Sequence, residues 1–191
     1  MFSNNSSGNQ DIKWLVYDEC NCADHNVSDN ISQIFNLKNI NTEYDEIYPS
    51  ISNSEFYFTS DRTGDFDLYT TEIMIDNLFH SFELEMSNNI ENIVTLSSDY
   101  DEKCPYVYQD LMVFTSNRPS GYGGYDLWYS IKTNDVWSQP INFGEHINSE
   151  FDEYRPIIIP VAASTNNLMI FSSNRPGGQG GFDLYYVGVF K

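Results

Sequence analysis

The sequence predicts an all-β protein built from repeated units, and three observations support this fold class. Aromatic residues make up 16% of the 191 residues, with 14 tyrosines and 13 phenylalanines, and aromatic side chains favour strands over helices. Alanine, the best helix former, occurs only as Ala23, Ala162 and Ala163. The third observation is a pair of motifs that recurs along the chain.

The first recurring motif is an acidic block that ends in proline. It reads NTEYDEIYP from Asn41, SSDYDEKCP from Ser97 and NSEFDEYRP from Asn148. Each copy has a small polar pair, an acid, an aromatic residue, Asp-Glu, two variable residues and a proline. The aspartates of the Asp-Glu pairs lie 56 and 51 residues apart, which indicates a repeated structural unit.

The second motif follows each acidic block and contains a glycine loop. Its three copies are FTSDRTGDFDLYT, FTSNRPSGYGGYDLWYS and FSSNRPGGQGGFDLYYV. A catalytic phosphate loop normally occurs once per domain, where a strand leads into a helix. Here the loop recurs and joins one run of β-branched and aromatic residues to another, so we expect a hairpin turn.

A fourth, degraded copy opens the chain. The stretch MFSNNSSGNQDIKWLVY keeps Phe2, Ser3 and a polar loop, and its Asp11 precedes Asp67 by the same 56 residues. This copy lacks the arginine, and its acidic block would lie before Met1. We therefore expect one domain over residues 1–191, with repeat units at about 1–40, 41–96, 97–147 and 148–191.

Each unit has the length and strand pattern of one antiparallel, four-stranded blade, so we predict a β-propeller of about four blades, or part of one. The inner strand of each blade would begin with the motif's proline, where no ladder donor is needed. Outer strands are short edges that tolerate sequence change, and we expect them at residues 34–40, 92–96 and 140–144. The longer segment 73–93 holds an insertion or a short helix.

These motifs resemble the WD-like propeller repeats of the TolB type, through the DExxP, FTSNR and GGYDLW blocks. The form SNRPGGxGGxDLY is similar to propellers in envelope proteins of Bacteroidetes-type bacteria, which often carry a peptidoglycan-binding domain like that of outer-membrane protein A. The resemblance covers nearly the whole chain. It implies a non-catalytic scaffold that binds a protein or cell-wall glycan, in the periplasm, at the outer membrane or outside the cell.

The recurring charged residues are expected to hold the repeats together. An arginine fork can satisfy a carboxylate and several carbonyls at once, and each arginine precedes an aromatic-Asp-Leu unit by a few residues. The Asp-Glu pairs are placed to cap a turn or to join that network. The predicted structural network comprises Asp45, Glu46, Arg62, Asp67, Asp101, Glu102, Arg118, Asp126, Asp152, Glu153, Arg175 and Asp183.

An enzyme is the alternative, either a glycoside-active propeller or the propeller domain of a larger hydrolase. A glycosidase needs two acids, but a catalytic pair should break a repeat pattern, whereas the paired acids here define it. The candidate acids that an enzyme could use are Asp24, which lies outside the repeat motifs, and Glu150, the first acid of the third acidic block. The chain has no Gly-x-Ser-x-Gly nucleophile elbow, so we expect no catalytic residues.

No cofactor is expected, although calcium stays an alternative. His25, His80 and His146 fall at unrelated repeat positions. The spacing of Cys20 and Cys22 is too tight for a zinc knuckle, and Cys104 supplies no second pair. The oxygen-rich stretches DNISQ, SDYDE and SEFDE would suit a hard cation, but none has EF-hand spacing.

Charge and hydropathy narrow the class of partner. The net charge of −19, from 28 acids against 9 bases, disfavours nucleic acid and anionic lipid. No apolar run approaches the length of a membrane span, and no signal peptide opens the chain. A partner should meet loops that differ between blades, at residues 20–33, 77–92 and 130–139. In the last of these, Trp137 either anchors a partner or packs between blades.

The repeats favour an incomplete propeller over four blades that close on themselves. The opening copy begins within a blade at Met1, so its inner strand is missing, and the last copy lacks its outer strand. An open propeller exposes strand edges and apolar blade faces. We therefore expect the chain to form oligomers.

Overall fold

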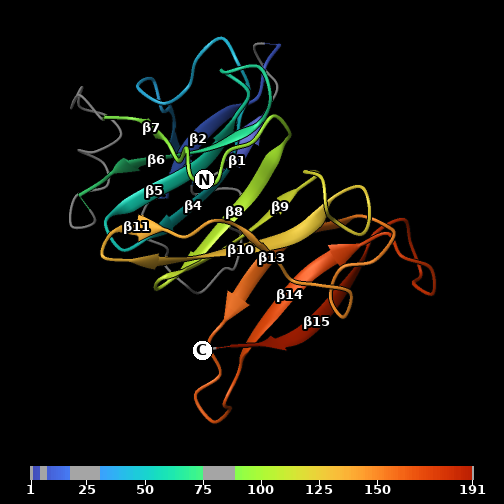
Figure 1. Ribbon diagram of the computed structural model, residues 1–191. Coiled ribbons are helices and arrows are strands. Elements are labelled where there is room, and N and C mark those ends of the chain that lie inside the picture. Colours follow the sequence, from blue (N-terminus) through green and yellow to red (C-terminus); the bar gives the residue numbers. More distant parts are fainter. Residues whose placement is uncertain (1, 5–7, 18–30, 75–88, 191) are drawn as a thin grey trace, which may run out of the picture.

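The computed structural model describes residues 2–4, 8–17, 31–74 and 89–190 of the chain. Within these residues it consists of strands and turns without a helix, which confirms the all-β prediction (Figure 1). No helix in this described part could therefore cross a membrane. The insertion or helix expected within 73–93, and most of the variable stretches 20–33 and 77–92, lie outside the described residues.

The strands form four antiparallel sheets, which we call blades 1 to 4. Blade 1 contains β1 (Phe2–Asn4), β2 (Asp11–Tyr17) and β3 (Ile31–Asn36). Blade 2 contains β4 (Glu46–Ser52), β5 (Glu55–Ser60), β6 (Asp67–Glu72) and β7 (Glu91–Asn92). Blade 3 contains β8 (Glu102–Tyr108), β9 (Leu111–Ser116), β10 (Asp126–Thr133), β12 (Ile141–Asn142) and a short hairpin strand, β11 (Val136–Trp137). Blade 4 contains β13 (Glu153–Ile159), β14 (Asn167–Ser173) and β15 (Asp183–Val189).

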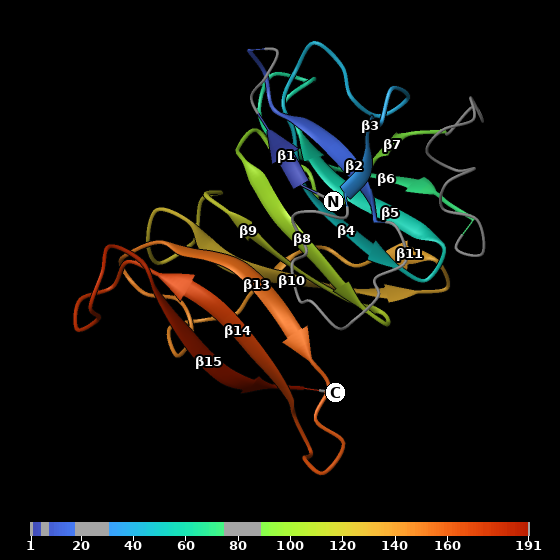
Figure 2. The same cartoon turned by 180° about the vertical axis from the view of Figure 1, so that it is seen from behind.

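The blades stack in sequence order around their inner strands. The inner strands β4, β8 and β13 contact one another in turn, and blades 1 and 4 lie at opposite ends of the row (Figures 1 and 2). Among the described residues, blade 1 has no inner strand and blade 4 has no outer strand. This arrangement agrees with a partial β-propeller.

The inner strands contain a bulge that the sequence pattern did not indicate. The strand register shifts at the DExxP motif in β4, β8 and β13. The residue before each proline has a positive φ: 53° at Tyr48, 56° at Cys104 and 53° at Arg155. The proline therefore lies inside the strand and not at its beginning, because a bulge leaves a residue without a ladder partner.

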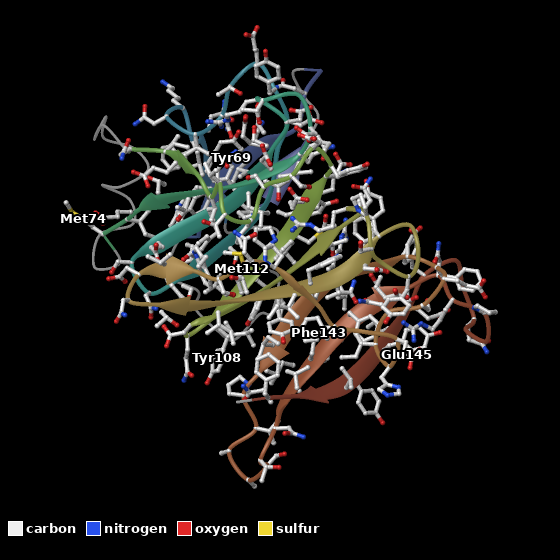
Figure 3. All side chains as sticks on the ribbon, in the orientation of Figure 1. Tyr69, Met74, Tyr108, Met112, Phe143 and Glu145 are labelled. Carbon is white, nitrogen blue, oxygen red and sulfur yellow. The ribbon has the colours of Figure 1, made fainter. Side chains whose placement is uncertain are left out.

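The hydrophobic core lies between the blades, where the facing sides of neighbouring sheets pack on each other. Along β5, Phe56 and Phe58 pack against blade 1, whereas Tyr57 packs against blade 3. Met112 of β9 lies in the same interior cluster as Tyr57, while the acidic side chain of Glu145 lies at the surface (Figure 3). A third cluster joins blades 3 and 4. Strand alternation therefore assigns successive residues to different blade interfaces.

Candidate functional site

Each acidic block places one fully buried glutamate at the start of an inner strand. Glu46, Glu102 and Glu153 are all 0% exposed. Each accepts hydrogen bonds from the backbone and hydroxyl of the residue four positions earlier and from a serine hydroxyl, and each forms an ion pair with an arginine. The hydroxyl and arginine partners are Thr42, Ser60 and Arg62; Ser98, Ser116 and Arg118; and Ser149, Ser173 and Arg175.

The arginine pairs with this glutamate and not with the aspartate of the aromatic-Asp-Leu unit, which corrects the pairing suggested by the sequence spacing. The Nη2–Oε1 distance is 2.9 Å for Arg118 and Glu102. Arg118 also donates to the carbonyl of Leu96, and its guanidinium carbon lies 5.2 Å from the ring centre of Trp128. Burial raises the pKa of Glu102 above its usual value, although Arg118 opposes the shift.

The aspartate of the aromatic-Asp-Leu unit instead closes the glycine loop. Asp126 accepts hydrogen bonds from the backbone of Gly123, at 3.1 Å, and from the side chain of Asn142, at 3.0 Å. Asp67 accepts hydrogen bonds from the side-chain hydroxyl of Thr63 and the side chain of Asn92, and Asp183 accepts one from the backbone of Gly180 at 3.2 Å. The loop is therefore a hairpin turn that also anchors the outer strand.

The aspartate of each Asp-Glu pair joins its blade to the preceding one. Asp152 accepts the backbone N–H of Tyr125 at 2.9 Å, and the backbone N–H of Glu153 donates to the carbonyl of Tyr125 at 2.7 Å. We call this two-bond arrangement the blade joint. The same joint links Phe66 to Asp101 and Glu102, and links Gln10 to Asp45 and Glu46.

The other candidate residues are not brought together. Glu150 and His146 are exposed, while Asp24, His25, His80, Cys20 and Cys22 lie outside the described residues. Within the described ranges, no three His, Cys, Asp or Glu side chains are placed to hold a metal ion.

Trp137 packs between two blades, which is the second of the two alternatives that its position left open, and the structure does not present it as an exposed anchor for a partner. It is 7% exposed and belongs to the cluster between blades 2 and 3. Its ring lies edge-on to Tyr57, with centroids 6.4 Å apart. The ammonium group of Lys132 lies over the same indole, with Nζ 5.4 Å from the ring centre.

The candidate binding site is a groove of about 660 Å³ between blade 4 and residues of blades 2 and 3. Its lining comes from three blades and consists of Tyr48, Tyr125, Asp152, Tyr154, Arg155, Ser172, Phe182 and Leu184. The guanidinium of Arg155 lies 5.4 Å from the ring centre of Tyr48. Tyr154 packs edge-on against Tyr125 and Phe182, at 4.8 Å and 6.2 Å.

One wall of the groove is fixed by a half-buried polar triad. Tyr125 donates its hydroxyl to Asp101 at 2.6 Å, and Lys103 donates to the same carboxylate at 2.7 Å. Burial would raise the pKa of Asp101, but hydrogen bonds from Lys103, Tyr125 and the backbone of Phe66 outweigh it and lower that pKa. The aspartate therefore stays ionised and holds the Tyr125 ring in place.

The motif's variable positions could have indicated this groove. Tyr48, Cys104 and Arg155 occupy the same position in their repeats, directly before the proline, and each blade has a different residue there. In the structure, Tyr48 and Arg155 face each other. A repeat position that varies among otherwise uniform copies was the signal that the sequence analysis missed.

Cys104 is buried in this region and should be chemically inert. Its exposed fraction is 5%, and burial raises the pKa of its thiol to about 12. The thiolate is the reactive form. In a variant with Cys20→Ser and Cys22→Ser, we expect Ellman's reagent at pH 8 to label Cys104 at least about 100-fold more slowly in the folded protein than in urea. Equal rates in the two conditions would contradict the buried placement.

Comparison with known proteins supports the fold alone. No family model matches the chain, and no curated protein matches it. The solved structure of a thermostable family-43 glycoside hydrolase is similar, with a TM-score of 0.56 at 12% sequence identity. The match covers 83% of this chain, which spans only 59% of the hydrolase chain. Family-43 hydrolases have a five-bladed β-propeller, so the likeness confirms a propeller fold.

Proposed function

We propose that the protein is a non-catalytic β-propeller scaffold of the bacterial cell envelope, which binds a protein partner in the groove of blade 4. The observation that carries this proposal is that the recurring carboxylates are all engaged in hydrogen bonds or ion pairs that hold the fold. The three glutamates are fully buried and hydrogen-bonded, and the aspartates before them form blade joints. Groups engaged in this way hold the fold and are not free to exchange protons with a substrate.

The groove has the character of a binding site. Binding sites are concave, largely apolar and aromatic, with a few polar groups that set orientation. Tyrosine and arginine are among the residues that dominate binding energy at protein interfaces, and here Tyr48, Tyr154 and Arg155 line one concave surface. The cell-envelope location draws its support from the resemblance of the repeat motifs.

The chemistry of the groove also favours a scaffold over a glycosidase. Glycoside hydrolysis uses two carboxyl groups, about 5–5.5 Å apart in retaining enzymes and about 6.5–9.5 Å apart in inverting ones. Among the described residues that line the groove, Asp152 is the single carboxylate. It already accepts hydrogen bonds from Tyr125 and Asn174. A second acid for this reaction would have to come from elsewhere.

Two assays test the proposal. With a panel of p-nitrophenyl glycosides, we expect no release of nitrophenol above buffer. In the second assay, this chain is immobilised and envelope proteins are passed over it. We expect Arg155→Asn to weaken the binding of the retained partner by about tenfold, or about 1.4 kcal/mol. Asparagine is chosen because it tolerates the positive φ of 53° at this position.

Lys38→Asn is the matched control, because it removes one positive charge from an exposed residue on blade 1. The Lys38→Asn variant should retain the envelope partner as well as the wild type does. Release of nitrophenol that Asp152→Asn abolishes would establish the enzyme instead. Retention on purified peptidoglycan, with no protein retained, would replace the protein partner with a glycan.

A further inference from the structure

The three blade joints share one geometry, and blade 4 carries an unfilled copy of it. In each joint, the residue before the Asp-Leu or Asp-Ile unit gives its N–H to an aspartate of the next blade and accepts the N–H of the adjacent glutamate. The N–H to carboxylate distances are 2.6, 3.3 and 2.9 Å at Gln10, Phe66 and Tyr125. The corresponding residue of blade 4 is Phe182, which is 51% exposed.

The surface around Phe182 is buried in the preceding blades and open in blade 4. Leu68 and Leu127, which follow the joints of blades 2 and 3, are 0% exposed, whereas the equivalent Leu184 is 78% exposed. Tyr186, two residues further along β15, is 79% exposed. Among the described residues, no strand pairs with the outer edge of β15. The leucine of the Asp-Leu unit is therefore a core residue in blades 2 and 3 and a surface residue in blade 4.

The glycine loop of blade 4 has open space at the positions where the glycine loop of blade 3 contacts the backbone of the next blade. A Cβ at Gly123 would lie less than 3.0 Å from the carbonyl oxygens of Ser149 and Phe151 in the next blade, so only glycine fits. At the equivalent Gly180, the nearest atom is the carbonyl oxygen of Phe182 at 3.7 Å, and Gly181 has nothing within 4 Å. Blade 4 therefore keeps glycines at positions where its own contacts do not require them.

We propose that this open face binds the acidic block and inner strand of a further repeat unit, a segment with the pattern Ser/Thr-x-aromatic-Asp-Glu-x-x-Pro. Its aspartate would accept the N–H of Phe182, and its glutamate N–H would donate to the Phe182 carbonyl, as in the three existing joints. The inference names the partner of the groove and thus rests on the proposed binding function.

The contacts in the existing joints also indicate which kind of residue should follow the Asp-Glu pair of the bound segment. In blade 3 this residue is Lys103, whose Nζ lies 4.1 Å from the ring centre of Phe66 in the preceding blade. In blade 4 it is Tyr154, which packs on Tyr125 of the preceding blade at 4.8 Å. The bound segment should therefore place a cation or an aromatic ring on Phe182, where both stacking modes are favourable.

A second copy of this chain does not meet these requirements. Its three acidic blocks, with Asp45, Asp101 and Asp152, are already engaged by the blades that precede them. Opening one of them would break a joint in order to form another. The occupant must therefore bring an acidic block of its own.

A peptide with the sequence of residues 140–161 tests the proposal, because it carries an outer strand, an acidic block and an inner strand. We expect fluorescence anisotropy to show saturable binding of the labelled peptide to the full chain at about 0.15 M ionic strength, where charge repulsion is screened beyond about 8 Å. A control peptide with alanine in place of Asp152 and Glu153 should bind at least tenfold more weakly.

Variants of the protein locate the site. Gly180→Ala should lower peptide affinity at least tenfold, because its Cβ would meet the incoming backbone, and Leu184→Asp should do the same. Val94→Asp is the matched control, since it also replaces an exposed aliphatic residue, 77% exposed, with an acid. It should bind the peptide as the wild type does. All three variants should keep the thermal midpoint of the wild type.

The outcomes separate this inference from the proposed function. Equal binding of the two peptides, no saturable binding, or unchanged affinity in Gly180→Ala would overturn the inference. A self-associated chain that Leu184→Asp converts to a monomer would make a second copy the occupant and would also overturn it. If the peptide experiments fail but an envelope protein is still retained in an Arg155-dependent way, the inference is wrong and the proposed function stands. Glycoside hydrolysis would overturn the proposed function and leave the inference about the open face untouched.

Discussion

Replacement of Glu102 by alanine is expected to lower the free energy of unfolding by about 3–5 kcal/mol, because it leaves Arg118 without its carboxylate in a largely buried site. Glu102 is 0% exposed and accepts hydrogen bonds from two serines as well as the arginine. Those donors would lose their acceptor together. Urea unfolding followed by tryptophan fluorescence would measure the loss.

Two further variants make this result specific. A double variant with methionine in place of both Glu102 and Arg118 should lose less than the sum of the two single replacements, since no unpaired charge remains. Glu145→Gln changes an exposed acid and should stay within about 0.5 kcal/mol of the wild type. A similar loss for Glu145→Gln and Glu102→Ala would contradict a structural role for the repeated glutamate.

Gly123→Ala is expected to destabilise the protein by about 1–3 kcal/mol, the usual range for an overpacked site. The added methyl group would overlap carbonyl oxygens of Ser149 and Phe151, which belong to the next blade and cannot move independently of its joint. For a protein of this size, this loss corresponds to a fall in the thermal midpoint of at least about 2 °C.

Gly180→Ala is the internal control for this prediction. It makes the same change at the same repeat position in blade 4, where the nearest atom to the new Cβ is 3.7 Å away. We expect its thermal midpoint to match that of the wild type within error. Equal destabilisation by the two replacements would mean that the glycine is needed for the loop itself and not for contact with the next blade.

Together these variants distinguish two kinds of repeat residue. Glu102, Ser116 and Arg118 act within the bend where one inner strand begins. Asp152, Tyr125 and Gly123 act between blades, and they complete their contacts only when the next blade is in place. In blade 4 the equivalents of Tyr125 and Gly123 are Phe182 and Gly180, and among the described residues no further blade meets them.

Much of the fold could be predicted from the sequence because repetition reveals geometry. The motif spacing of 56 and 51 residues indicated the blades, and the runs of β-branched and aromatic residues on either side of the glycine loop indicated the strands that it joins. The bulge was missed because proline in a strand usually marks an edge or a beginning. The partner of Arg118 was missed because Asp126 is closer in sequence than Glu102, while hydrogen bonding across the sheet places Glu102 directly opposite Ser116.

The groove and the role of Trp137 depended on tertiary structure. Tyr48, Tyr125 and Arg155 come from three blades and are far apart in sequence, so only the stacking of blades brings them to one concave surface. Trp137 lies in the short hairpin strand β11, in a segment that varies among repeats, and it packs against Tyr57 of the neighbouring blade. Neither arrangement follows from local pattern.

The all-β class, the repeat and the charged residues that recur in each blade could all be read from the amino-acid sequence, because they depend on local strand pattern and on motifs that repeat. Which of those residues face another blade, and which surface stays open among the described residues, follow from the tertiary structure. The physical reason is that burial is a property of neighbours: Leu127 and Leu184 share a motif, but one is 0% exposed and the other 78%, because a blade covers the first and none of the described residues covers the second.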